Sequence, residues 1–136
     1  MNLAQRMLAV AKDVSHIAKD VTVSHYGANY KGLSHDGVVS AGRDAMIKHG
    51  VLALPSVIAT RYSEVMTSKG KTQQMIDVDV ETTFINAEQM DERLSVITTG
   101  SGIDAQDKHP GKAMSYAKKY GLLYGFLLIT GENDEA

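Results

Sequence analysis

Apolar residues near the start of the chain recur at steps of four and three residues, which is the spacing of one helix face. They are Leu3, Met7, Val10, Val14, Ile17 and Val21. Charged residues lie off this seam, so the pattern predicts an amphipathic helix over residues 1–21. We expect a polar, glycine-containing loop over residues 24–32, and then a weaker helix over residues 33–49 that stops at Gly50.

From Val51 onward the pattern changes to that of β-strands. Residues 51–67 are rich in β-branched and apolar side chains, a Lys-Gly turn follows, and residues 72–86 form a second predicted strand. In this second strand apolar side chains alternate with acidic and polar ones, the period of a half-buried strand. A third strand is expected over residues 93–99. Short turns join the three strands without room for a crossover helix, which predicts an antiparallel meander over residues 51–99.

A last helix is predicted over residues 110–128. Pro110 suits its first turn, where the missing N–H would be unpaired in any case. A loop over residues 100–110 precedes the helix, and an acidic tail over residues 130–136 follows it. The order predicts an α+β fold in one domain, residues 1–136: an antiparallel three-stranded β-meander with N-terminal helices and a C-terminal helix packed across the sheet.

Composition narrows the class of protein. The 136 residues suffice for one domain with a core. The absence of cysteine excludes disulfides, thiolate metal sites and a cysteine nucleophile. The first residues lack the apolar run of a signal peptide. The longest apolar stretch, residues 122–129, is far shorter than the ~20 residues that a bilayer crossing needs. We therefore expect a soluble cytoplasmic protein with no membrane partner.

The charge nearly cancels but is segregated along the chain. The formal net charge is -2, whereas nucleic-acid-binding domains are usually basic overall, so any positive surface must be local. Lysines gather in and before the last helix and on either side of Gly70, at Lys108, Lys112, Lys118, Lys119, Lys69 and Lys71. Acidic residues gather in the second predicted strand, at Asp77, Asp79 and Glu81, and in the C-terminal tail.

Tyrosines and lysines form two separate stripes on the last helix. The stripes consist of Tyr116, Tyr120 and Tyr124, and of Lys108, Lys112, Ser115 and Lys119. An ordinary amphipathic helix has this pattern, with its tyrosines in the core and its lysines in water. The same stripes suit a groove for single-stranded nucleic acid, because tyrosines stack on bases and lysines follow the phosphates. Periodicity alone leaves both interpretations open.

The order of residues in this helix is more specific than its periodicity. The run Ser115-Tyr116-Ala117-Lys118-Lys119-Tyr120, preceded by a loop and followed by an apolar run, closely resembles the signature helix of the essential recombination function (ERF) family. Weaker similarities are the runs Tyr30-Lys31-Gly32-Leu33 and Ile47-Lys48-His49-Gly50-Val51 and the acidic segment after Gly131. The resemblance spans residues 25–135.

This resemblance implies an annealing protein of phage homologous recombination. Such proteins coat single-stranded DNA and pair complementary strands without nucleotide hydrolysis. The implied fold is that of the eukaryotic single-strand annealing proteins, a β-meander crossed by a helix, which agrees with the fold predicted from the pattern. The implied partners are single-stranded DNA, the annealed duplex intermediate and further copies of the chain in a ring or filament. No cofactor is implied, and the location is the cytoplasm of the bacterial host.

Lysines would supply attraction to DNA that is independent of base sequence and falls with salt. Lys112, Lys118 and Lys119 are the main candidates, with Ser115 as a phosphate donor. The full set of candidate DNA-binding residues is Lys112, Ser115, Lys118, Lys119, Lys108, Lys69, Lys71, Arg61, Tyr116 and Tyr120. One subunit with so few lysines would bind weakly, so the mechanism requires an array of subunits along one strand. The heptad-like first helix and the open edges of the meander are candidate subunit contacts.

Several of these candidates have a second interpretation. Lys69 and Lys71 could be a solvated turn, and Arg61 could pair with Asp79 or Glu81 across the hairpin. The two candidate tyrosines are expected in the core more than as base platforms, because a small domain without tryptophan needs large side chains inside.

The chain departs from the family pattern in two respects. Lys118 and Lys119 stand where many members have paired arginines, which keeps the charge but loses the planar bidentate contact to phosphate. The chain also ends just after the acidic segment, where many relatives continue into a tail that contacts the host single-strand-binding protein. Whether that protein is a partner here stays open.

Other function classes fit the residues less well. Gly70-Lys71 and Gly111-Lys112 lack the glycine five residues earlier that a phosphate-binding loop requires. A metal-dependent nuclease could use the acidic face of the second strand, but nothing in the sequence completes such a site, and the five histidines are scattered without ligand spacing. A structural or assembly protein that oligomerises without DNA is a third alternative. We predict a protein that is not an enzyme and has no catalytic residue and no metal site.

Overall fold

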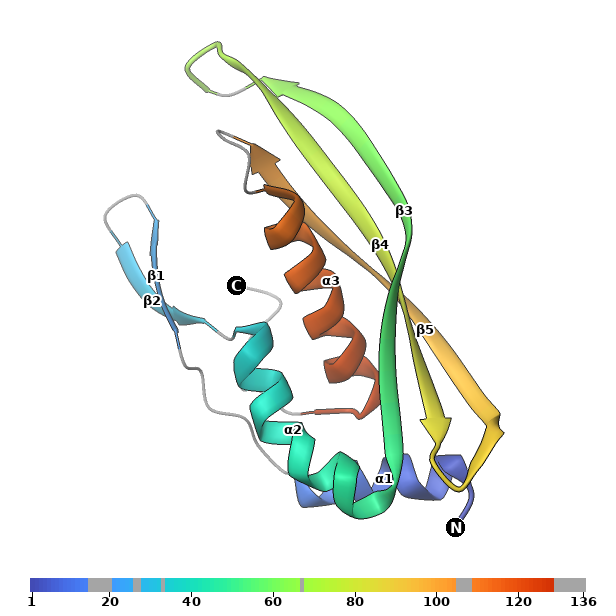
Figure 1. Cartoon of the computed structure of the whole chain (residues 1–136). Helices are drawn as coiled ribbons and strands as arrows, with labels where there is room; N and C mark the ends of the chain where they lie inside the picture. Colours follow the sequence, from blue (N-terminus) through green and yellow to red (C-terminus); the bar gives the residue numbers. More distant parts are fainter. Residues whose placement is uncertain (15–20, 26–27, 33, 67, 105–108, 129–136) are drawn as a thin grey trace.

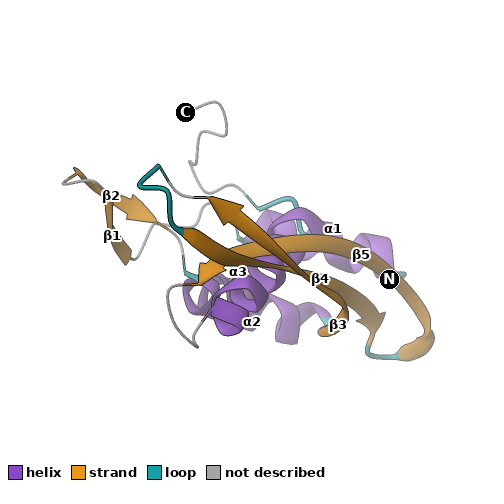
Figure 2. Cartoon of the chain, turned by 90° about the horizontal axis from the view of Figure 1, so that it is seen from above, coloured by secondary structure: helices purple, strands orange, loops and turns teal. Residues whose placement is uncertain are grey.

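The structure, a computed structural model, describes residues 1–14, 21–25, 28–32, 34–66, 68–104 and 109–128. The elements are α1 (Leu3–Asp13), β1 (Val21–His25), β2 (Ala28–Gly32), α2 (His35–His49), β3 (Val51–Met66), β4 (Thr72–Asn86), β5 (Gln89–Asp104) and α3 (His109–Gly125). β3, β4 and β5 form an antiparallel sheet with β4 in the middle, and β1 and β2 form a separate hairpin. Figure 1 shows α3 lying along the three-stranded sheet, and Figure 2 shows β1 and β2 apart from that sheet.

The predicted α+β fold with a three-stranded antiparallel meander is confirmed. Its third strand is longer than predicted. β5 stays paired with β4 as far as Asp104, opposite Gln74, so residues 100–104 of the expected loop belong to the strand. The glycines at 100 and 102 that indicated a loop lie inside the strand, and at Gly100 the reason is the close approach of α3 described below.

Two predictions about the N-terminal part were wrong. The first helix, expected over residues 1–21, ends at Asp13, and Val21 belongs to β1. The expected loop over residues 24–32 contains the end of β1 and the whole of β2, which pair from Val21 with Gly32 to His25 with Ala28. Val21, Thr22 and Val23 are β-branched, and this strand preference prevailed over the helical spacing. Ile17 lies outside the described residues.

The ends of α1 and α2 follow from capping residues. Asn2 accepts a hydrogen bond from the Gln5 backbone N–H, and the Gln5 side chain accepts one from the Asn2 N–H, which is a complete capping box. Ser34 caps α2 by accepting a bond of 2.9 Å from the backbone N–H of Gly37. Gly50 ends α2 in the left-handed conformation, with φ of 69°, which a residue without Cβ adopts at least cost.

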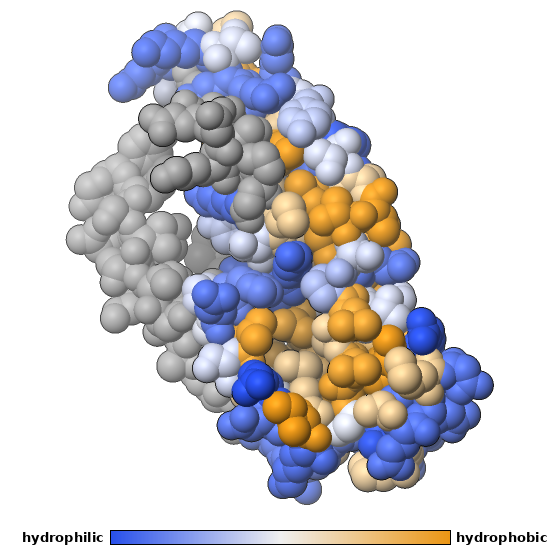
Figure 3. Space-filling model, viewed as in Figure 1, coloured by the Kyte–Doolittle hydropathy of each residue, from blue (hydrophilic) through white to orange (hydrophobic). Residues whose placement is uncertain are grey.

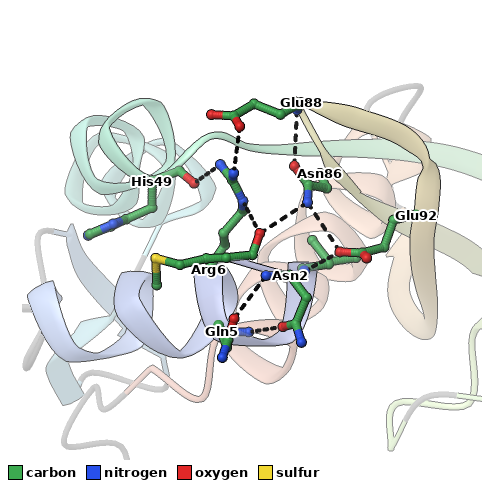
Figure 4. A network of polar contacts seen from close by, with 9 residues as sticks. Asn2, Gln5, Arg6, His49, Asn86, Glu88 and Glu92 are labelled. Carbon is green, nitrogen blue, oxygen red and sulfur yellow. Dashed lines mark hydrogen bonds and ion pairs between the residues drawn. The ribbon is translucent and has the colours of Figure 1, made fainter.

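The buried side chain of Arg6 joins α1 to the turn between β4 and β5 and to the end of α2 (Figure 4). Arg6 donates from Nε to the Met1 carbonyl at 3.0 Å and from Nη1 to the His49 carbonyl at 2.9 Å, and its Nη2 lies 3.1 Å from Glu88 in the β4–β5 turn. Asn86 donates to Glu92 at 3.2 Å across the same turn. The network satisfies a charge that would otherwise be costly to bury.

The core lies between the helices and one face of the sheet. Alternate residues of β4 point inward and are buried, as the alternation predicted: Ile76, Val78, Val80, Thr82 and Phe84. One apolar cluster joins α1 and α2 to Phe84 and to the C-terminal half of α3, and a second joins the other end of β4 to Ala113 and Ala117 of α3. None of the helices in the described part of the chain combines the length and apolar character that a membrane crossing requires.

Candidate nucleic-acid interface

Small residues bring α3 against β4 and β5. Ala113 and Ala117 are fully buried on the sheet side of the helix. Gly100 of β5 lies so close to them that a Cβ there would be 2.0 Å from the Ala113 carbonyl oxygen. The Thr98 hydroxyl donates to the Ala117 carbonyl at 2.5 Å. The helix is therefore held at a fixed height and rotation, which decides where its lysines point.

The lysines of α3 differ in exposure. Lys112 and Ser115 are exposed on the side of the helix away from the sheet. Lys118 is half-buried and lies at a cavity of about 200 Å³ between α2, α3 and β3. The cavity is lined by His35, Val39, Met46, Ala53, Pro55, Thr82, Lys118 and Leu122. Its walls are mostly apolar, and Lys118 is the lysine among the residues that line it.

Lys119 is placed differently from the other candidate lysines. It is only 4% exposed, and its Nζ lies 5.0 Å from the ring centroid of Tyr116 and 4.8 Å from that of Tyr120. The Nζ of Lys112 lies 5.8 Å from the ring centroid of Tyr116. These are cation–π contacts, which are stronger where the cation is shielded from water. The sequence predicted Lys119 as a phosphate contact, and its position favours a role in holding the two rings.

The tyrosines divide between core and surface. Tyr120 is half-buried against the main apolar cluster, as expected. Tyr116 is 37% exposed, so the expectation that it belongs to the core was wrong, because its ring packs on lysine side chains at the surface. Tyr124 is exposed and stacks on Tyr120, with ring centroids 5.7 Å apart.

The turn between β3 and β4 carries two further candidates. Lys69 and Lys71 are exposed on either side of Gly70, whose φ of 74° makes the turn. Figure 1 shows this turn and the N-terminal end of α3 at the same end of the molecule, so the structure brings these lysines toward the end where Lys112 lies. Lys108 lies outside the described residues.

Arg61 pairs with Asp79 across the hairpin, which confirms one of its two sequence interpretations. Its two terminal nitrogens donate to the two carboxylate oxygens at 2.6 and 3.0 Å, and Thr99 donates to the same carboxylate at 2.7 Å. These bonds, with Arg61 as the largest cause, lower the pKa of Asp79 to about 2, and the Asp79 carboxylate raises the pKa of Arg61. Arg61 is thus engaged on the outer face of the sheet, away from α3.

The acidic residues of β4 also lie on that outer face. Asp77 accepts a bond of 2.5 Å from Ser101, and Asp79 is bonded as described above. Within the described ranges no three carboxylate or histidine side chains are grouped as metal ligands would be. The sheet therefore separates an acidic outer face from the helical side that carries the lysines.

Two residues at the cavity were not found from the sequence. His35 is brought to the cavity by the start of α2, and Thr82 by its inward position on β4. Thr82 occupies one of the alternate, inward-facing positions of β4. A polar residue at such a position was the only feature of the sequence that could have indicated its place at the cavity. Its hydroxyl is buried and has no hydrogen-bond partner among the described residues.

Comparison with known proteins identifies one family. A family model described as the ERF superfamily matches residues 3–136, nearly the whole chain. A search of curated proteins and a search of solved structures gave no match. The match includes α3 and the sheet that positions it.

Proposed function

The chain belongs to the ERF superfamily, and we propose that it binds single-stranded DNA along the outer side of α3 and anneals complementary strands without ATP, acting as an oligomer. The family has a general role in phage recombination and strand annealing. The remaining steps of the proposal are supported by how the described residues are arranged.

The observation that carries the proposal is the exposed cationic side of α3. Lys112 and Ser115 point away from the sheet, and Lys118 lies at the cavity beside β3. Lysines at these positions attract a phosphate backbone without reading base edges. Annealing requires this, because the base edges must stay free to pair with a second strand.

The charge distribution directs DNA to the same side. Asp77 and Asp79 lie on the opposite face of the sheet, so a strand there would meet carboxylates. Lys69 and Lys71, at the end where α3 begins, would extend the cationic track beyond the helix. Lys119 would act indirectly, by fixing the Tyr116 ring beside Lys112.

The test is binding of a fluorescent single-stranded oligonucleotide of mixed sequence, measured by anisotropy over a range of salt concentrations. We expect the double variant Lys112→Ala/Lys118→Ala to bind at least about tenfold more weakly. The slope of log K against log salt should fall by ~0.7 for each phosphate that the variant no longer neutralises. The matched control is Lys12→Ala, which removes an exposed lysine from α1. Equal affinity and slope in the double variant and the parent would contradict the site assignment.

The activity itself is tested with complementary oligonucleotides in the presence of a chelator and without nucleotide. We expect the parent protein to accelerate duplex formation under these conditions. Loss of labelled strands only when a divalent metal is added would support a nuclease instead. Self-assembly without any binding to single strands would support a structural protein.

A further inference from the structure

The cavity between α2, α3 and β3 has a buried hydroxyl group among its lining residues. Thr82 of β4 is 1% exposed, and its Oγ1 has no hydrogen-bond partner among the described residues. α3 places Gly121 against this hydroxyl, because a Cβ there would clash with Thr82 Oγ1. A glycine has no side chain that could pair with it. Buried polar groups are normally hydrogen-bonded, so this one indicates a bond that a ligand completes.

The other walls of the cavity are mostly apolar and come from three elements. They include Val39 and Met46 of α2, Ala53 and Pro55 of β3, and Leu122 of α3. Figure 3 shows apolar side chains gathered on the side of the molecule where β3 runs. The cavity volume of about 200 Å³ is less than the ~300–1,000 Å³ of pockets that enclose drug-sized ligands. Its size and walls therefore fit a single ring system and exclude a whole nucleotide.

The charged residues at the cavity favour a ligand with a negative charge. Lys118 is half-buried, and His35, with 28% of its side chain exposed, is the other basic residue of the lining. None of the described residues that line the cavity is acidic. The carboxylate of Asp36, 3.5 Å from His35 Nδ1, is fully exposed, so water weakens its effect on a bound anion. The ligand that fits joins a ring with polar edge atoms to an anion close by.

A nucleotide of a single strand combines these properties, because its base is a ring with polar edge atoms and its phosphate lies one sugar away. We propose that the cavity takes one nucleobase of the bound strand, with the Thr82 hydroxyl bonded to the base edge and Lys118 at the phosphate. A hydroxyl both donates and accepts, so it can pair with an edge atom of any base. An aliphatic side chain of a protein partner would leave Thr82 unpaired, which disfavours that occupant.

This inference rests on the proposed function and adds a second kind of contact to it. Lys112 is six residues from Lys118, roughly 9 Å along the axis of α3. The phosphates at Lys112 therefore belong to neighbouring nucleotides, whose base edges stay free to pair with a second strand. The inserted base is withheld from pairing. Binding consequently has a part that depends on the presence of bases, which phosphate contacts alone do not supply.

The experiment compares two fluorescent oligonucleotides of equal length by anisotropy at one low salt concentration, one made of thymidines and one of abasic sugars. Ala53→Leu fills the cavity from β3, and Thr82→Val removes the hydroxyl with little change of shape. The matched control is Ala59→Leu, the same change at another half-buried alanine of β3 that is not among the lining residues. An unchanged far-UV circular dichroism spectrum and a urea midpoint no lower than that of the parent would show that each variant is folded.

We expect the parent to bind the thymidine strand at least about tenfold more tightly than the abasic strand. Ala53→Leu should abolish this difference, and Ala59→Leu should keep it. Thr82→Val should weaken binding of the thymidine strand by about three- to tenfold, because one hydrogen bond is lost, and leave binding of the abasic strand unchanged. Thr82→Val decides the matter if Ala53→Leu does not fold.

A difference between the two strands that persists in both Ala53→Leu and Thr82→Val would overturn the inference. If Tyr124→Leu abolished that difference instead, the base would lie on this exposed ring and not in the cavity. Equal affinity of the parent for the two strands would overturn the inference and leave the proposed function standing. Failure of the parent to bind either strand would overturn the proposed function itself.

Discussion

α3 packs closely against the sheet at Gly100 on β5. A Cβ on this residue would lie 2.0 Å from the Ala113 carbonyl oxygen and 2.7 Å from the Ala117 backbone nitrogen. Both are backbone atoms of the helix, so rotation of a side chain cannot relieve the clash. We therefore predict that Gly100→Ala forces α3 away from β5 and destabilises the domain.

The loss of stability in Gly100→Ala can be worked out from the contact between α3 and β5 that the new methyl group must open. The helix would have to move by about 1 Å or more before the added methyl fits. Overpacking of this kind costs about 1–3 kcal/mol. The bond from Thr98 to the Ala117 carbonyl would be strained or broken, which adds ~1 kcal/mol. The expected loss of stability is about 2–4 kcal/mol, a large part of the ~5–15 kcal/mol by which a domain is stable.

The assay is urea denaturation followed by far-UV circular dichroism, at one fixed protein concentration because assembly shifts apparent stability. Gly42→Ala is the matched control. Its Cβ would meet only the Met46 Cε, at 3.6 Å, and the residue lies inside α2, so alanine should stabilise by about 0.5–1 kcal/mol. Surface substitutions usually change the free energy of unfolding by less than ~0.5 kcal/mol. If Gly100→Ala changed it by no more than that, the close packing of α3 on β5 would be refuted.

Two further predictions concern hydroxyl and carboxyl groups of the sheet. Thr82→Val should be neutral or stabilise the domain by ~1 kcal/mol, because the buried Thr82 hydroxyl lacks a hydrogen-bond partner among the described residues. Thr98→Val should destabilise the domain by ~1 kcal/mol, because it removes the hydrogen bond to the Ala117 carbonyl. Equal effects of the two variants in urea denaturation would contradict this prediction. Arg61 is the main cause that lowers the pKa of Asp79 from 3.8 to about 2. The ionised carboxylate therefore contributes stability that is fully present above pH 3.8 and is lost as the pH falls from 3.8 to about 2. Arg61→Gln should therefore flatten the pH dependence of the urea midpoint there, and an unchanged pH profile would argue against the pairing.

The sequence pattern predicted the structure correctly where a residue's surroundings are set by its neighbours in the chain or across one hairpin. The alternation of β4 identified its buried face, and the short turns identified the meander. Pairing across the hairpin was enough to name Asp79 as one partner of Arg61. The spacing of apolar residues failed at Val21, because there a helical seam and a β-branched strand place the same residue type at the same position.

The residue order of the last helix determined the family to which the chain belongs, and its periodicity predicted that lysines and tyrosines would form two stripes on one helix. Only the tertiary structure decided their surroundings. Lys119 is buried beside two rings, whereas Lys112, on the same stripe of the same helix, is exposed. Helical periodicity gives these two positions the same direction, so the difference depends on what the fold packs around each of them. Only the tertiary structure shows that α3 covers the inner face of β4 and leaves Val57 and Tyr62 of β3 exposed. The unequal cover of the strands depends on how elements far apart in the chain pack together, and the periodicity of each element alone does not contain that information.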